Sequence, residues 1–140
     1  MFWNKKNILI LLGLALALIA SVARADFTFG EPVNLGPTVN SWANEWGPCI
    51  SADGLELYFG SSRGGGSGEE DLWVTTRSTI DDDWTTPVNL GSTVNSSSID
   101  AMPSISSDGL ELYFGSNRPG GPGNGDIWVA KQATKKDPWE

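Results

Sequence analysis

Two glycine-rich loops that end in an aspartate are the first candidates for chemistry in this sequence. Residues 65–71 read Gly-Gly-Ser-Gly-Glu-Glu-Asp, and residues 120–126 read Gly-Gly-Pro-Gly-Asn-Gly-Asp. Carboxylate oxygens are the ligands that Ca²⁺ prefers, so Glu69, Glu70 and Asp71 form a candidate calcium site. A structural role is favoured, in which the aspartate accepts hydrogen bonds from loop N–H groups. The aspartate comes one residue later than in tandem Gly-Gly-x-Gly-x-Asp calcium repeats, and no other cofactor is predicted.

Four charged residues flank these loops at matched positions. Arg63 and Arg118 each stand two residues before one of the loops, and Asp71 and Asp126 end them. We expect an Arg–Asp pair to brace each loop through charge-assisted hydrogen bonds. The alternative is that the arginines bind an anion.

A second set of candidates precedes the first strand of each predicted unit. Glu45 and Asp100 are equivalent acids there, and they either line a binding pocket or are solvated loop acids. Residues 42–47 are the only stretch of the repeat without identity to its counterpart, which suits a loop that contacts a specific partner. Trp42 and Trp46 are suited to stacking on a sugar ring or anchoring a protein contact. The alternative is that Trp46 packs beneath the loop.

All these residues belong to a repeated scaffold. Residues 32–85 return 55 positions later as residues 87–140, with 31 of 54 positions identical and no gap. A constant period of this size indicates one supersecondary unit that is used repeatedly and buries its apolar faces by stacking.

Each unit reads as strands and turns. In the first unit, clustered or alternating apolar, β-branched and aromatic residues predict strands over residues 48–51, 55–59, 71–77 and 84–90. An Asp-Gly pair between the first two strands predicts a hairpin. Pro87 places the fourth strand at an edge, because proline cannot donate a ladder hydrogen bond. The expected fold is all-β, with four antiparallel strands in each unit.

The string Pro-x-Ile-Ser-x-Asp-Gly-x-x-Leu-Tyr-Phe-x-Ser-x-Arg, followed by the glycine-rich loop and Asp-(Leu/Ile)-Trp-Val, occurs at residues 48–74 and 103–129. It resembles the WD40-like β-propeller repeat of TolB-type proteins. The resemblance implies two four-stranded blades, residues 29–83 and 84–138, and a third that begins at Trp139. It also implies a periplasmic or extracellular platform for docking or ligand binding, without a particular ligand.

Two blades are fewer than the roughly four to eight that close a propeller. The chain is then either a piece of a longer protein or a member of an assembly in which identical chains complete the ring. The beginning of a third repeat favours the first interpretation.

Catalysis is not predicted. The sequence contains no histidine, which removes the usual serine and cysteine triads and the commonest metal ligand. A sialidase-like propeller is the enzymatic alternative, because residues 51–54 read Ser-Ala-Asp-Gly, similar to part of a turn that sialidases carry. The later tryptophan of that turn is missing, and the arginine cluster for the substrate carboxylate would have to come from Arg63, Arg77 and Arg118.

Residues 1–25 are predicted to be a signal peptide. Lys5 and Lys6 precede an uncharged apolar run of 13 residues, and Ala-Arg-Ala at 23–25 provides a cleavage signal. The run is shorter than the ~20 residues that span a bilayer. An uncleaved anchor is the alternative. The mature chain, residues 26–140, is expected to be secreted or periplasmic, with no membrane span.

The charge composition of the mature chain limits the classes of molecule that it can bind. Without the three basic residues of that segment, six basic residues remain against 17 acidic ones, so nucleic acid is a poor partner. Cationic proteins, neutral glycans and divalent cations are better candidates. Cys49 is the sole cysteine, which excludes an intramolecular disulfide. We predict an exported, non-catalytic scaffold that binds a protein of the cell envelope; the alternative is a glycan-binding or glycoside-cleaving propeller completed by other blades or subunits.

Overall fold

The computed structural model describes residues 28–140, and all regular secondary structure in that part of the chain is β-strand. The all-β prediction is therefore confirmed. Within the same residues, no helix has the length and apolar character needed to cross a membrane. The predicted signal peptide lies outside the described residues.

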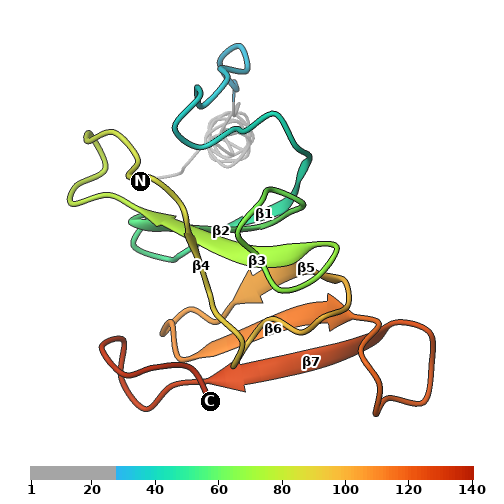
Figure 1. Cartoon of the computed structure of the whole chain (residues 1–140). Coiled ribbons are helices and arrows are strands. Elements are labelled where there is room, and N and C mark those ends of the chain that lie inside the picture. Colours follow the sequence, from blue (N-terminus) through green and yellow to red (C-terminus); the bar gives the residue numbers. More distant parts are fainter. Residues whose placement is uncertain (1–27) are drawn as a thin grey trace, which may run out of the picture. The chain divides into compact units, whose positions relative to one another are not determined.

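The strands form two antiparallel sheets (Figure 1). Sheet 1 has the order β1 (Glu45–Ile50), β2 (Glu56–Ser61), β3 (Asp71–Thr76) and β4 (Val88–Asn89). Sheet 2 has the order β5 (Asp100–Ile105), β6 (Glu111–Ser116) and β7 (Asp126–Lys131). Within each sheet, every strand pairs with the next strand in the sequence, as expected for consecutive hairpins.

The second sheet has three strands, whereas the repeat predicts four. β4 is a short strand at the edge of sheet 1, as expected for a segment that begins with a proline. In the second repeat, the backbones of Lys131 and Glu140 exchange two hydrogen bonds, of 2.9 and 2.7 Å. At the equivalent place in the first repeat, Thr85 donates to the Thr76 carbonyl at 2.9 Å. Edge pairing therefore begins at the same position in both repeats.

Each hairpin turns at an Asp-Gly pair, as predicted. Gly54 and Gly109 have φ angles of +73° and +76°, which glycine adopts without steric cost. In the first turn, the Asp53 carboxylate accepts hydrogen bonds from the Ser51 hydroxyl at 2.6 Å and the Leu55 N–H at 3.1 Å. These bonds close the turn and fix where β2 begins.

Both first strands contain a bulge. The register of β1 against β2 and that of β5 against β6 shift at the same place. The bulge residue with positive φ is Gly47 in β1 (54°) and Met102 in β5 (55°). Pro48 and Pro103 follow them, and a bulge tolerates a residue that donates no ladder hydrogen bond.

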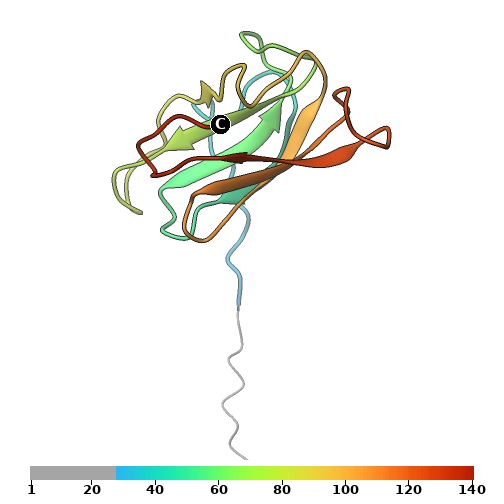
Figure 2. The same cartoon turned by 90° about the horizontal axis from the view of Figure 1, so that it is seen from below.

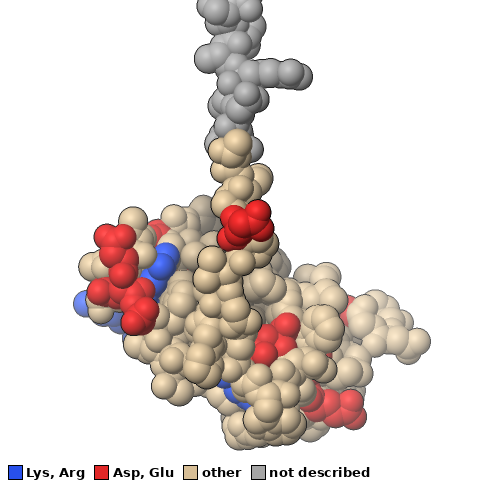
Figure 3. Space-filling view, turned by 90° about the horizontal axis from the view of Figure 1, so that it is seen from above, with Lys and Arg blue, Asp and Glu red and all other residues tan. Residues whose placement is uncertain are grey.

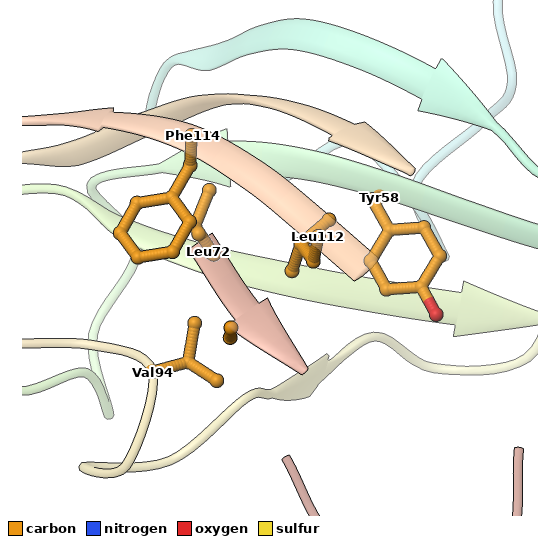
Figure 4. Packing of buried hydrophobic residues seen from close by; sticks show 6 residues of the cluster. Tyr58, Leu72, Val94, Leu112 and Phe114 are labelled. Carbon is orange, nitrogen blue, oxygen red and sulfur yellow. The ribbon is translucent and has the colours of Figure 1, made fainter. Parts of the chain in front are cut away.

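The main apolar core lies between the two sheets, as Figure 4 shows. Tyr58 and Leu72 of sheet 1 pack against Leu112 and Phe114 of sheet 2, and Val94 packs against them from the segment that joins the sheets. Leu72 and Leu112 are completely buried. Seen from below in Figure 2, strands of the two sheets overlap in projection, as expected for sheets that pack face to face.

A second cluster covers the opposite face of sheet 1. Leu57, Phe59 and Trp73 pack there against Val39. These four residues are the repeat equivalents of residues that pack in the main core from sheet 2 and from the segment before it. Equivalent apolar residues of the two repeats therefore form one side of the main core in sheet 2 and the second cluster in sheet 1.

Polar contacts also link the sheets, and one is a backbone hydrogen bond of 2.8 Å from the Asp100 N–H of β5 to the carbonyl of Glu70, the residue before β3. The Ile105 N–H donates to the free Cys49 thiol at 3.4 Å. The Lys135 ammonium lies 2.9 Å from the Asp53 carboxylate, and both side chains remain partly exposed. Solvent screens such an exposed ion pair, so apolar packing holds the sheets together.

Candidate functional site

An open apolar groove lies between the first strands of the two sheets. Its walls come from the β1 bulge, the loop before β3 and the start of β5: Trp46, Gly47, Pro48, Glu70, Ile99, Ala101, Met102 and Pro103. The strands approach closely here, since a Cβ built on Gly47 would lie 2.9 Å from the Met102 Cα atom. The loop that differs between the repeats therefore leads into a junction between the sheets.

Glu70 is the one acidic residue of this groove. Its Oε1 atom is buried and has no hydrogen-bond partner in the described part of the chain. Burial raises the pKa of this carboxyl group, because a low dielectric disfavours the charged form. The equivalent residue in the second repeat is Gly125. A carboxylate among apolar groups and without a cation is complementary to a positively charged ligand group.

The groove also has exposed large apolar side chains. Trp46 is 55% exposed and Met102 is 73% exposed, so Trp46 is not packed beneath its loop. Trp42 stands earlier in the same loop and is 91% exposed. Exposed tryptophan and methionine side chains are typical of surfaces that bind partners.

The surface has an excess of acidic groups. Figure 3 shows more acidic (red) than basic (blue) side chains on one face, in agreement with the formal net charge of −8 for the chain. A field of this sign favours the approach of cationic partners.

Glu45 and Asp100 are engaged by arginines. The Arg63 Nη2 atom donates to Glu45 at 2.9 Å, and the Arg118 Nη2 atom donates to Asp100 at 2.5 Å. Each arginine also donates to a backbone carbonyl in the segment before its first strand, at 2.7 and 2.6 Å. Each guanidinium lies 5.0 to 5.3 Å from the ring centroids of a Phe and a Trp in its own sheet. The acids therefore brace their sheets from within.

The protonation of these two acids supports that role. Burial alone would raise the pKa values of Glu45 and Asp100, but hydrogen bonds from serine and arginine side chains outweigh it and lower both. Asp100 is completely buried as an ion and depends on Arg118, whereas Glu45 keeps some contact with solvent.

The aspartates predicted to pair with the arginines have other partners. Asp71 accepts hydrogen bonds from the N–H groups of Ser67 at 2.8 Å and Gly68 at 3.3 Å. Asp126 accepts one from the Gly123 N–H at 3.3 Å. The predicted Arg–Asp pairing is therefore corrected: each aspartate turns back into its own loop, and each arginine reaches a first-strand acid instead.

The same geometry explains why the loops are rich in glycine. A Cβ built on Gly66 would lie 1.6 Å from the Asp71 carboxylate, and one on Gly121 would lie 1.9 Å from that of Asp126. Glu69 is exposed, and among residues 28–140 no three His, Cys, Asp or Glu side chains converge as metal ligands. Calcium binding by this loop stays a prediction.

No protein-family model and no curated protein matches the sequence. The site is therefore interpreted from its own geometry. The sequence singled out Trp46 but did not place Glu70 or Met102 in a groove with it. A difference between the two repeats could have pointed to both residues. Glu70 has Gly125 as its counterpart, and Met102 has Gly47.

Proposed function

We propose that the chain is a pair of β-propeller-type blades that acts as an exported, non-catalytic binding module for a protein of the cell envelope. Each sheet would be one blade, with consecutive antiparallel strands and a face packed on its neighbour, as in such repeats. The observation that carries the proposal is the apolar groove in which the Glu70 carboxylate has no cationic partner.

The groove favours a partner segment that combines apolar and basic side chains. Trp46 and Met102 would contact its apolar part, since exposed aromatic residues dominate the free energy of protein contacts. Glu70, which lines the groove, would receive the basic group in a charge-assisted hydrogen bond. The acidic surface would raise the association rate.

The arrangement of the arginines favours binding over sialidase-like catalysis. Arg63 and Arg118 are held by the two first-strand acids. Arg77 donates to the backbone carbonyls of Gly54 and Ile80 at 2.8 and 2.7 Å. Each arginine of the described residues therefore has its own structural partners, which leaves no cluster to receive a substrate carboxylate.

The test uses two synthetic peptides of equal length, one alternating Leu and Lys and the other alternating Leu and Glu. Binding to the full chain is followed by tryptophan fluorescence. We expect only the basic peptide to bind, and Glu70→Gln to weaken binding about tenfold through loss of a charge-assisted hydrogen bond. Glu69→Gln is the matched control, because it removes a charge from an exposed neighbour. Equal binding of both peptides, or no effect of Glu70→Gln, would contradict the proposal.

Glycan binding is the second candidate function. The observation in its favour is the exposed indole of Trp42, which is free to stack on a sugar ring. A glycan array probed with the full chain and with Trp42→Ala and Trp46→Ala distinguishes the candidates. Sugar signals lost in both variants would support it, and an array without any signal would eliminate it. A glycosidase screen on the same samples tests the cleaving alternative.

A further inference from the structure

Sheet 2 exposes the side chains that sheet 1 buries at equivalent positions. Tyr58 is 4% exposed and its equivalent Tyr113 is 41% exposed; Leu72 is 0% exposed and its equivalent Ile127 is 78% exposed. In sheet 1 these side chains pack against sheet 2. The outer face of sheet 2 therefore has the composition of a buried face.

Sheet 1 carries the complementary face on its far side. That face contains the second apolar cluster, and a hollow borders it that includes Leu35 and Phe59. Leu35 and Ile50 are 49% and 51% exposed, whereas their equivalents Leu90 and Ile105 pack against the main core. One copy of the chain therefore presents both halves of the contact that joins its own sheets.

The outer edge of sheet 2 shows the same incompleteness. In sheet 1, the edge of β3 binds β4. The Asn95 side chain then accepts from the Leu72 N–H at 2.8 Å and donates to the Leu72 carbonyl at 3.0 Å. On β7, only the final residue has an edge partner in the described part of the chain.

A segment suited to this edge is present in the same chain. Residues 32–41 match residues 87–96 at nine of ten positions. The Asn34 side chain accepts from a loop N–H at 2.8 Å and from Asn40 at 3.0 Å, and the equivalent bonds of the second repeat have the same lengths. Residues 34–40 thus have the conformation that binds β3, although Asn40 bonds no strand backbone within the described residues.

The junction between the two sheets is filled by a small residue and a large one. A Cβ built on Gly60 would lie 2.9 Å from the Glu70 Oε1 atom and 3.4 Å from the Ala101 Cβ atom. Glu70 and Ala101 therefore occupy the space above Gly60 together.

On the outer face of sheet 2 the sizes are reversed. The equivalent of Glu70 is Gly125, and a hollow of about 360 Å³ lies beside Gly125 and Gly115. The residue of a second copy that corresponds to Ala101 is Trp46. A large side chain would thus meet the hollow that the missing glutamate leaves.

We infer that a second copy of this chain docks head to tail on sheet 2. Its residues 34–40 lie along the open edge of β7, the far face of its sheet 1 covers Tyr113 and Ile127, and its Trp46 fills the hollow above Gly115. The contact is heterologous, because two different surfaces meet. It goes beyond the proposed peptide binding because it joins two copies of the chain, and the two contacts share residues: Trp46 belongs to the groove, and Met102 lines both the groove and the hollow that Trp46 of the second copy fills.

The first experiment is sedimentation velocity of the full chain over a concentration series. We expect concentration-dependent association of the parent chain. Ile127→Asp on the outer face of sheet 2 and Leu35→Asp on the far face of sheet 1 should each be monomeric, because either change places a charge in the apolar contact. Both positions are exposed enough in one copy for folding to persist, which circular dichroism checks. Ser92→Asp, at an exposed turn position that belongs to neither apolar cluster, is the control and should associate like the parent.

Mixing the two variants tests the head-to-tail geometry. Each variant keeps one intact surface, and the intact surfaces are complementary, so a mixture should form a dimer and no larger species. Association through two copies of the sheet 2 face would survive Leu35→Asp and would not be restored by mixing. A monomeric parent chain, or association that persists in both variants, would overturn the inference.

An added charge offers a gain-of-function test. Lys135 pairs with Asp53 between the sheets of one chain, but the second copy would bring Ile80 to the equivalent Asp108. Ile80→Lys should supply the missing ion pair and tighten association about two- to fivefold, with the gain reduced by salt. Weaker association of Ile80→Lys, or a gain that Asp108→Asn does not remove, would count against this orientation.

Discussion

Sheet 1 and sheet 2 are built from nearly the same sequence, yet they occupy different environments. Leu72 of β3 and Ile127 of β7 occupy equivalent positions in the two repeats. Leu72 is completely buried, whereas Ile127 is 78% exposed. The local strand pattern does not differ between them. What differs is the neighbour: sheet 1 has sheet 2 against this face, and sheet 2 has no described segment there. In a stacked repeat, the burial of a side chain depends on the neighbouring repeat and not on its own strand alone.

The largest expected effect sharpens this comparison directly. Leu72→Ala should lower the free energy of unfolding by about 3 kcal/mol, because it leaves a cavity in a packed core. Ile127→Ala should change it by less than about 0.5 kcal/mol when measured below the concentration at which copies of the chain associate. Urea unfolding followed by circular dichroism measures both. Equal losses would show that the two faces are buried alike.

The two braces should also differ. Arg118→Met leaves the completely buried Asp100 charge without its partner and should lower the free energy of unfolding by about 3 kcal/mol. Arg63→Met should lower it by about 1 to 2 kcal/mol, since Glu45 keeps contact with water. The unfolding midpoints of the two variants, compared with Arg118→Met/Asp100→Asn, test the cause. A double variant no more stable than Arg118→Met would contradict it.

Exchanging the bulge residues tests the junction. Gly47→Met should destabilise the fold by about 2 kcal/mol, because it adds a strained positive φ and directs a Cβ to within 2.9 Å of the Met102 Cα atom. Met102→Gly should be neutral or stabilising by up to about 1 kcal/mol, because it removes that strain from β5. Thermal unfolding of both variants is the measurement. A large loss in Met102→Gly would show that the methionine packs more tightly than its exposure suggests.

The smallest expected effect concerns Glu70, whose counterpart in the second repeat is Gly125. Because burial raises the pKa of Glu70, the folded chain holds that proton more tightly than the unfolded chain, whose carboxyl pKa is about 4. The contribution of Glu70 to stability is therefore complete below pH ~4 and falls as pH rises through the folded pKa. Glu70→Gln should gain stability over the parent from acidic to neutral pH. Unfolding curves at several pH values, with Glu69→Gln as the control for charge, check this; a constant difference would refute it.

The sequence predicted much of the fold and less of the site. The Asp-Gly turns, the strand pattern and the edge position of β4 could be read because glycine, proline and alternating apolar residues act locally. The groove could not be read, because Trp46, Glu70 and Met102 come from three segments that meet only when the sheets stack. The predicted Arg63–Asp71 pair is wrong for a related reason. Asp71 is close to Arg63 in the sequence, but Glu45 of the first strand is its partner in space.

The amino-acid sequence by itself determined that this chain is a tandem β-repeat, where its hairpins turn and which side chains are apolar enough to require burial. Backbone preferences and period-two patterning are short-range, so a single strand carries them. Only the tertiary structure decided which of two equivalent faces is covered, which acid each arginine binds and where a carboxylate has no partner. Those outcomes depend on the neighbour that each surface meets, and two nearly identical repeats cannot encode different neighbours in their shared residues.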